Sequence, residues 1–353
     1  MKIMFRKKTL LCVLASISLL AACGDGSEKS ISDKPIEPVQ EEPKEILYPT
    51  PFTGELISNE ITMRPVIATI NNHPAARPQS GIASADVVYE MLAEGDVTRF
   101  LALFQSEIPD SIGPIRSARS YFIELADGLD AFYIAHGFSP EAKQMLENGI
   151  VDNINGMYYD GSFFKRSKDR VAPHNSYFMS DNLEAAAEKV NASLLYQKKV
   201  SYTYYDDEES VKVGAQADRI HVRYSNNENF NSTYSYDPVS NTYSRSSGGT
   251  VTTDLLTGEP IKLSNVLVLE MDHQVIDNKG RREIDIYSGG RAYIFQQGMM
   301  RELRWENIDG VLTAVEIDGS EAKLMPGKTW IHFVPTNPGI ATSVTYSNSE
   351  QQS

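Results

Sequence analysis

The chain has 353 residues, of which 41% are apolar, 23% charged and 9% aromatic, and its formal net charge is −14. These fractions exclude collagen-like, coiled-coil and wholly disordered chains, and the length suffices for about two domains. Only two cysteines are present, which excludes a multi-disulfide scaffold.

The N-terminus has the pattern of an exported lipoprotein. Residues 1–22 join a basic segment to an uncharged run that starts at Thr9, which has the length of an export signal and is too short for a stable membrane span. The run ends in Leu20-Ala21-Ala22-Cys23, which resembles the bacterial lipobox. The resemblance implies that Cys23 is acylated, that it becomes the new N-terminus after cleavage, and that the membrane is a partner through this lipid anchor. We therefore expect a signal peptide over 1–22 and a position on the outer face of the cytoplasmic membrane. An ordinary signal peptide followed by a chance cysteine is the alternative.

Residues 23–50 are expected to be the acylated cysteine and a disordered linker. This segment holds four prolines and seven acidic residues, so it cannot bury enough apolar surface to order itself. Cleavage of the signal removes four basic residues and no acid, which leaves the mature chain still more acidic. Nucleic acid is therefore excluded as an expected partner, because duplex binding needs clustered positive charge.

Residues 51–200 alternate between strand and helix patterns, which predicts an α/β N-terminal domain. Short apolar runs rich in β-formers predict strands at 66–70, 86–90, 100–104 and 131–135. Helices are predicted to begin at caps on Ser117, Ser139 and Asp181, and Gly149 is expected to end the second.

Residues 201–345 change to a period of two, which predicts a mainly antiparallel β C-terminal domain of the barrel or sandwich type. A hairpin is predicted over 233–245, and further strands at 266–271, 283–287, 291–295, 311–317 and 329–334. Residues 346–353 are expected to be a polar tail. The change of period predicts two cores, so the two domains are expected to unfold separately or with weak coupling.

No metal or cofactor is predicted. Gly327-Lys328-Thr329 lacks the first glycine and the following helix of a phosphate-binding loop. The six histidines are scattered, and no unacylated cysteine remains in the mature chain to complete a zinc site.

Polar residues unusual for plain packing follow the predicted strands between 71 and 175, at the edge where open α/β sheets bind ligands. The candidate ligand-binding residues are Arg99, Arg116, Ser117, Arg119, His136, Arg170, His174 and Asn175. The secondary candidates are Asn71, Asn72, Arg77, Asp86 and Glu90.

Three of the arginines are expected to line one anion-binding pocket. Arg116 precedes the helix predicted to be capped at Ser117, and Arg119 follows three residues later, where cations oppose the helix dipole unless an anion compensates. We expect Arg99 to join them, with His136 or His174 nearby. The alternative is an internal carboxylate, such as Asp86, Glu90 or Asp96, as the compensating charge.

The segments Arg64-Pro65-Val66, Ala85 to Glu90, Gly113 to Arg119 and Ala172 to Asn175 resemble the YerB-like lipoproteins of Gram-positive bacteria. Later segments such as Ser288-Gly289-Gly290 resemble the C-terminal domain of that family. The resemblance covers nearly all of the chain beyond the linker. It implies a surface lipoprotein with two domains of unknown function.

Two functions are compatible with these features. The first is an envelope protein that binds an anionic wall component or a partner protein through the arginine-rich site. The alternative is an enzyme acting on a phosphate-bearing glycan or polyprenyl-linked wall precursor, because residues 98–117 are faintly similar to the LytR-type wall-polymer ligases. Those enzymes use arginines and an acid-held magnesium, but Ser117 stands here at the position of their acid. We favour binding over catalysis.

Overall fold

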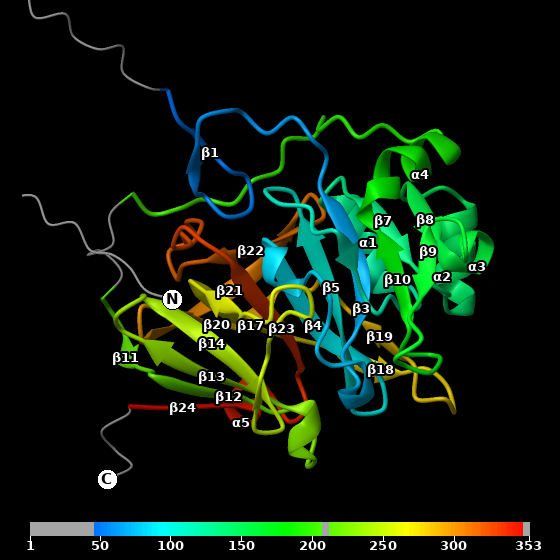
Figure 1. Cartoon of the computed structure of the whole chain (residues 1–353). Helices are drawn as coiled ribbons and strands as arrows, with labels where there is room; N and C mark the ends of the chain where they lie inside the picture. The colour runs from blue at the N-terminus through cyan, green and yellow to red at the C-terminus, as the bar shows by residue number, and fades with distance from the viewer. Residues whose placement is uncertain (1–45, 207–211, 349–353) are drawn as a thin grey trace, which may run out of the picture. The chain divides into compact units, whose positions relative to one another are not determined.

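The computed structural model describes residues 46–206 and 212–348, and strands dominate it (Figure 1). The predicted signal peptide, Cys23 and most of the predicted linker lie outside the described residues, as do residues 349–353 of the predicted tail. The helices are α1 (Ser120–Gly128), α2 (Pro140–Glu147), α3 (Gly156–Tyr159), α4 (Leu183–Lys189) and α5 (Ile340–Ser343). The 3-10 turns are η1 (Pro74–Ala76), η2 (Ile82–Ser84), η3 (Ser180–Asn182) and η5 (Glu228–Phe230).

An eleven-stranded sheet forms the centre of the described structure. Its strands, in spatial order, are β11 (Ala215–Gln216), β21 (Met299–Ile308), β20 (Gly290–Gln296), β17 (Asn265–Met271), β23 (Thr329–Pro335), β4 (Val87–Glu94), β5 (Val97–Phe104), β3 (Val66–Asn71), β7 (Phe132–Ala135) and β8 (Asn153–Asn155), with β22 (Val311–Val315) on β21. β23 runs parallel to both β17 and β4, and β3, β7 and β8 are mutually parallel neighbours. The remaining pairs are antiparallel.

Smaller sheets complete the fold. A six-stranded antiparallel sheet contains β15 (Thr250–Val251), β14 (Thr242–Ser247), β13 (Ser232–Asp237), β12 (Arg219–Val222), β24 (Val344–Ser347) and β16 (Lys262–Leu263). A three-stranded sheet contains β6 (Ser111–Ile112), β10 (Ser176–Met179) and β9 (Phe164–Arg166). Two strand pairs remain: β1 (Tyr48–Pro49) with β2 (Leu56–Ile57), and β18 (His273–Val275) with β19 (Arg282–Ile284). β1 lies inside the predicted linker, and β24 reaches into the predicted tail.

The core is shared between the halves of the chain that precede and follow residue 200. Side chains alternate across β4, so that Tyr89 packs in a cluster with α1 and β21, while Val88 packs in a second cluster with the six-stranded sheet. Both clusters combine residues from the two halves. Within the large sheet the two halves are joined by the parallel pairing of β23 with β4, visible in Figure 1. The expectation of two separate cores is therefore wrong.

The predicted strands of the first half are present, but their arrangement is not clearly α/β. β4 and β5 form an antiparallel hairpin through Gly95 and Asp96, and β5 then pairs antiparallel with β3. Gly95 has φ +54, which suits the tight turn. A strand covered on both faces is apolar throughout, so its sequence is the same whether its neighbour is parallel or antiparallel. The antiparallel prediction for the second half is confirmed, apart from β23.

The predicted cap of the first helix is wrong. α1 begins at Ser120 with Arg119 as its N-cap, and the Ser117 hydroxyl instead donates to the His136 carbonyl. The cause is that residues 113–118 form extended bridges to neighbouring segments rather than a helical turn. The cap of the second helix is confirmed, because Ser139 Oγ accepts from Ala142 N.

Candidate functional site

The backbone of Arg116 is held between the ends of β3 and β7. Its N–H donates to the Thr69 carbonyl (2.8 Å), and its carbonyl accepts from the His136 N–H (2.9 Å). β3 and β7 are parallel, so their carboxyl ends meet at one edge of the sheet. The predicted location at strand ends is therefore where Arg116, Asn71 and His136 lie.

Two histidines adjoin Arg116, and their rings stack with centroids 4.8 Å apart. His73 Nδ1 accepts from Ala75 N (3.1 Å), and His174 Nδ1 accepts from the Asn71 side-chain amide (2.8 Å). Because each Nδ1 acts as an acceptor, the neutral ring carries its proton on Nε2. Neither Nε2 has a hydrogen-bond partner among the described residues, so both N–H groups remain available as donors.

The surroundings of these side chains are positively charged. Burial lowers the pKa of Arg116 to about 10, and Arg99 adds to the shift. Burial also lowers the pKa of His73, followed by the charges of Arg77 and Arg116. The pKa of His174 falls for the same reasons, with burial first and then the fields of His73, Arg116 and Arg170.

Arg116 lacks an acidic partner among the described residues. The only hydrogen bond of its side chain there is a long one to the Pro173 carbonyl (3.3 Å), and its buried Nε has no partner. We call Asn71, His73, Arg116 and His174 the Arg116 site. His73 belongs to the polar run 71–73 after the first predicted strand, but it was not among the candidate ligand-binding residues.

The His136 ring belongs to a separate contact group. Arg166 donates to its Nε2 (3.1 Å), so its Nδ1 carries the proton and donates to Ser176 Oγ (2.7 Å). Arg166 also contacts Asn175 (3.0 Å) and pairs with Asp160 (2.9 Å). Burial and the charge of Arg166 lower the pKa of His136.

Arg99 and Arg119 do not share a pocket with Arg116. Both pair with Glu94 at the end of β4, Arg99 at 2.6 Å, and both arginines are almost fully buried. Arg99 also donates to the Ser117 carbonyl (2.9 Å). The expected three-arginine pocket is therefore wrong. The compensating carboxylate is Glu94, because the β4–β5 hairpin brings it within reach of both guanidinium groups.

Arg170 and Arg77 hold loops together. Arg170 donates to the carbonyls of Ala76 and Pro78 (both 2.7 Å) and so fixes the turn after His73. Arg77 donates to the Asn72 carbonyl (2.9 Å) and to the Asn229 carbonyl (2.8 Å). Backbone carbonyls thus take the place of acidic partners for these two arginines.

Asp86 has an internal role. It is buried and accepts from the backbone N–H groups of Gln105 (2.7 Å) and Ser106 (2.9 Å), as well as from the Ser106 hydroxyl. Burial raises its pKa, and the Ser106 hydrogen bonds oppose that rise. These contacts anchor the start of β4 to the end of β5.

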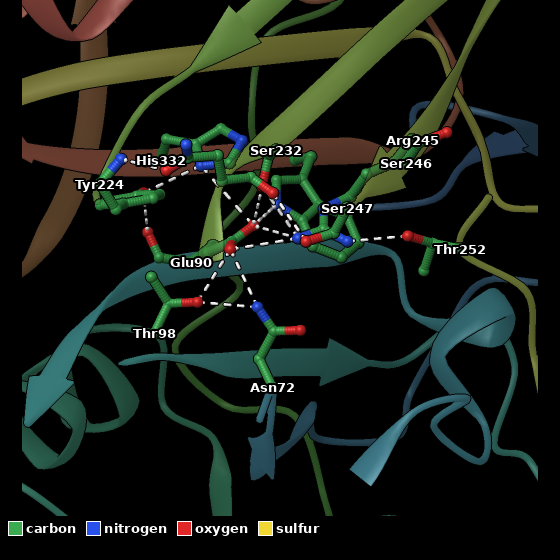
Figure 2. A network of polar contacts seen from close by, with 12 residues as sticks. Asn72, Glu90, Thr98, Tyr224, Ser232, Arg245, Ser246, Ser247, Thr252 and His332 are labelled. Carbon is green, nitrogen blue, oxygen red and sulfur yellow. Dashed lines mark hydrogen bonds and ion pairs between the residues drawn. The ribbon is translucent and has the colours of Figure 1, made fainter. Parts of the chain in front are cut away.

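Glu90 is fully buried at the centre of a polar network (Figure 2). Its carboxylate pairs with Arg245 of β14 (3.0 Å) and accepts from Trp330 Nε1 (3.0 Å). It also accepts from the side chains of Asn72, Thr98 and Ser232. Burial raises the pKa of Glu90, but Arg245 and these donors outweigh it and hold the pKa below its usual value.

His332 lies beside this network. Its two ring nitrogens contact the hydroxyls of Tyr224 (2.9 Å) and Tyr234 (2.6 Å), and burial lowers its pKa to about 4. The network was missed as a unit because its members come from strands that are distant in sequence.

Neither a metal-ligand cluster nor a membrane span is found within 46–206 and 212–348. No group of three or more His, Cys, Asp and Glu side chains in these ranges is arranged to hold a metal ion. No helix in the same ranges is long and apolar enough to cross a membrane.

Two family models cover most of the chain on either side of residue 200. The N-terminal domain model of the family described as "Protein of unknown function (DUF3048)" matches residues 52–193, and the C-terminal domain model matches residues 220–331. The chain therefore belongs to this two-domain family. The Arg116 site lies in the first domain, and the Glu90–Arg245 pair joins the two.

A relative of this chain is named as a lipoprotein. The chain is 42% identical over 287 residues to "Putative lipoprotein YerB" of Bacillus subtilis (strain 168), a match that covers 81% of this chain and 86% of that protein. It also resembles the crystal structure of YerB protein from Bacillus subtilis, with a TM-score of 0.78 and 40% identity. That match covers 85% of this chain and 100% of the other. The resemblance to YerB-like lipoproteins is confirmed.

Proposed function

We propose that this chain is a lipid-anchored protein of the cell envelope whose Arg116 site binds an anionic group of a wall component. The observation that carries the proposal is the donor set. Arg116 and the two Nε2–H groups of His73 and His174 are donors, and no carboxylate contacts them among the described residues. An arginine fork with neighbouring N–H donors suits a phosphate or a carboxylate.

The overall charge of the chain makes this site unusual. Acidic residues outnumber basic ones by 47 to 33, so a surface cation would ordinarily find a carboxylate nearby. Arg99 and Arg119 share a carboxylate in Glu94. Arg77 and Arg170 donate to backbone carbonyls at short range, whereas the side chain of Arg116 has neither kind of partner among the described residues beyond its long contact with Pro173. Its backbone is also fixed by two strands, which reduces the ordering cost of binding.

The lipid anchor rests on the lipobox at Cys23 and on the name of the Bacillus subtilis relative. Two or three acyl chains hold a protein stably at a bilayer. We expect Cys23→Ala to move the protein from the detergent phase to the aqueous phase in detergent-phase partitioning of cells. A variant that still enters the detergent phase would refute the anchor.

The site is tested by calorimetric titration of the full-length protein in detergent with inorganic phosphate and with isolated wall fragments. We expect Arg116→Gln to raise the Kd about ten- to hundredfold, because hydrogen bonds to a charged group contribute about 1.5–3 kcal/mol. The matched control is Arg304→Gln, which removes an exposed positive charge from β21. We expect it to bind as tightly as the unmodified chain.

Four results would overturn the proposal. One is an affinity that Arg116→Gln leaves unchanged, and another is the absence of binding to either anion. Turnover of a labelled lipid-linked glycan by the unmodified protein would instead favour the enzyme, and a wall-independent protein ligand would favour a partner protein.

A further inference from the structure

A pocket of about 280 Å³ begins next to the Arg116 site. One wall is formed by the turn that follows His73, including Pro74, Arg77 and Gln79, and the facing wall is formed by Ser247 and residues 250–253 of the second domain. His73 is the residue before Pro74, and the field of Arg77 acts on its ring. The pocket and the Arg116 site are therefore neighbours along one short segment.

The buried Glu90 carboxylate supports both walls of this pocket. On one side it accepts from Asn72 Nδ2 (3.1 Å), and Asn72 Oδ1 accepts in turn from Arg77 Nε (3.1 Å). On the other side it pairs with Arg245, whose Nη1 donates to Thr252 Oγ1 (2.8 Å). Figure 2 shows Glu90 between Asn72 and Arg245, with Thr252 beyond. The walls are thus fixed before any ligand arrives.

The chemistry of the lining is that of a site for hydroxyl groups. Because the Thr252 oxygen accepts from Arg245, its own hydroxyl hydrogen is left to donate elsewhere. Gln79 is only 1% exposed, and its Oε1 is an acceptor that lacks a partner among the described residues. Pro74, Pro78 and Val251 add apolar surface beside these polar groups. Ligand pockets combine apolar walls with a few placed polar groups in this way.

We infer that the pocket receives a sugar unit of the same ligand whose anion binds at the Arg116 site, so that the ligand is a phosphorylated sugar. The volume lies just below the range of about 300–1,000 Å³ for drug-sized ligands, so it suits one monosaccharide. The inference rests on the proposed function for the anion, and it adds the chemical class of the group attached to that anion.

The test compares three probes on the full-length protein in detergent: inorganic phosphate, neutral hexoses and a panel of hexose 1-phosphates. We expect the best hexose phosphate to bind at least about tenfold more tightly than inorganic phosphate. Thr252→Val, which removes the donor, should abolish that gain and leave the Kd for inorganic phosphate unchanged.

Thr252→Val also deprives Arg245 of an acceptor, so a loss of binding in this variant could come from a folding defect. A second variant that leaves this hydrogen bond intact is therefore needed. Thr250 is exposed and lines the pocket, so Thr250→Trp fills the pocket from the surface. Val239→Trp, at a 91% exposed position of the β13–β14 turn, is its matched control. Thr250→Trp should abolish the hexose gain, and Val239→Trp should keep it.

The outcomes separate the inference from the proposed function. If inorganic phosphate binds but no hexose phosphate exceeds it, or if both pocket variants keep the gain, the sugar pocket is refuted and the anion site stands. If the unmodified protein binds no phosphate and no hexose phosphate, both are refuted.

Discussion

Two groups of arginines near the end of β3 have opposite environments. Arg99 and Arg119 are buried against Glu94, whereas Arg116 is held by its backbone and has no carboxylate contact among the described residues. All three have a lowered pKa, with burial as the largest cause, so the shift does not distinguish them. The counter-charge does. A buried pair serves the fold, whereas a cation on a fixed backbone without a counter-charge is the basis of our proposal that Arg116 binds an anion from outside the chain.

The largest loss of stability is expected at the buried Glu90–Arg245 pair, where the arginine is fully neutralised. Glu90→Gln leaves Arg245 buried without a counter-charge, which should lower the free energy of unfolding by about 3–5 kcal/mol. Glu302→Gln breaks the exposed pair with Arg291 and should cost at most about 1 kcal/mol. Urea titration of both variants measures the difference. Equal small losses would mean that the buried pair is not needed by the fold.

Acid should reveal the same buried network. The pKa of His332 is lowered to about 4 by burial, against about 6.5 in an unfolded chain. Between these values the unfolded state binds the extra proton, so stability rises with pH and is lost on acidification. We expect His332 to account for a loss on the order of 3 kcal/mol between pH 6.5 and 4.

The readout for this prediction is the slope of unfolding free energy against pH, rather than stability at one pH. Between pH 4 and 6.5, His332→Asn should reduce that slope by the amount that corresponds to about one bound proton. His273, whose pKa burial also lowers to about 4, supplies a second proton, so His273→Asn should reduce the slope independently. A slope that neither variant changes would contradict the assignment.

The sequence predicted most of the longer strands but few of the short ones, and it did not predict how the strands pair. The runs that became β3, β4 and β5 were recognisable because each is apolar and rich in β-formers. The pairing of β23 with β4 was beyond sequence reasoning, because no local pattern encodes a contact between residues so far apart in the chain. β21 was missed as a strand, because its charged residues hide the alternation of buried Leu303 and Trp305.

The sequence predicted that the candidate residues lie at strand ends, but it did not predict which of them pair with one another. Asn71, Arg116 and His136 do lie at the shared carboxyl edge of two parallel strands, as the strand-end argument requires. The partner of Arg99 was missed because Glu94 reaches it only across the β4–β5 hairpin. A single sequence shows which residues carry charge, but not which charges neutralise one another.

The contrast between Arg99, which has a carboxylate partner, and Arg116, which has none among the described residues, can be measured as a difference in the free energy of unfolding. Arg99→Gln leaves Glu94 with Arg119 alone in a largely buried setting, and should cost about 1–3 kcal/mol. Arg116→Gln removes one weak hydrogen bond and should change stability by no more than about 0.5 kcal/mol. Thermal and urea unfolding of both variants provide the measurement. A loss of several kcal/mol for Arg116→Gln would make that residue a structural cation and exclude the ligand site.

The smallest effect concerns the pH dependence of anion binding. Burial, followed by the charges of Arg77 and Arg116, holds the pKa of His73 below the ordinary value of about 6.5. Burial, followed by His73, Arg116 and Arg170, does the same for the pKa of His174. Both rings are thus neutral at pH 7, and an anion bound beside them raises their pKa.

Binding should therefore take up protons and tighten as the pH falls below about 6.5. One added charge at about 4 Å in water is equivalent to about 1 kcal/mol, or about fivefold in affinity. Sulfate is the suitable probe because its charge is constant over this range, and calorimetry in two buffers of different ionisation enthalpy counts the protons. The double variant His73→Asn, His174→Asn should abolish the uptake, whereas His136→Asn should retain it, because His136 contacts Arg166 and Ser176 instead. Proton release on binding, or uptake that the double variant leaves intact, would exclude the two rings from the anion site.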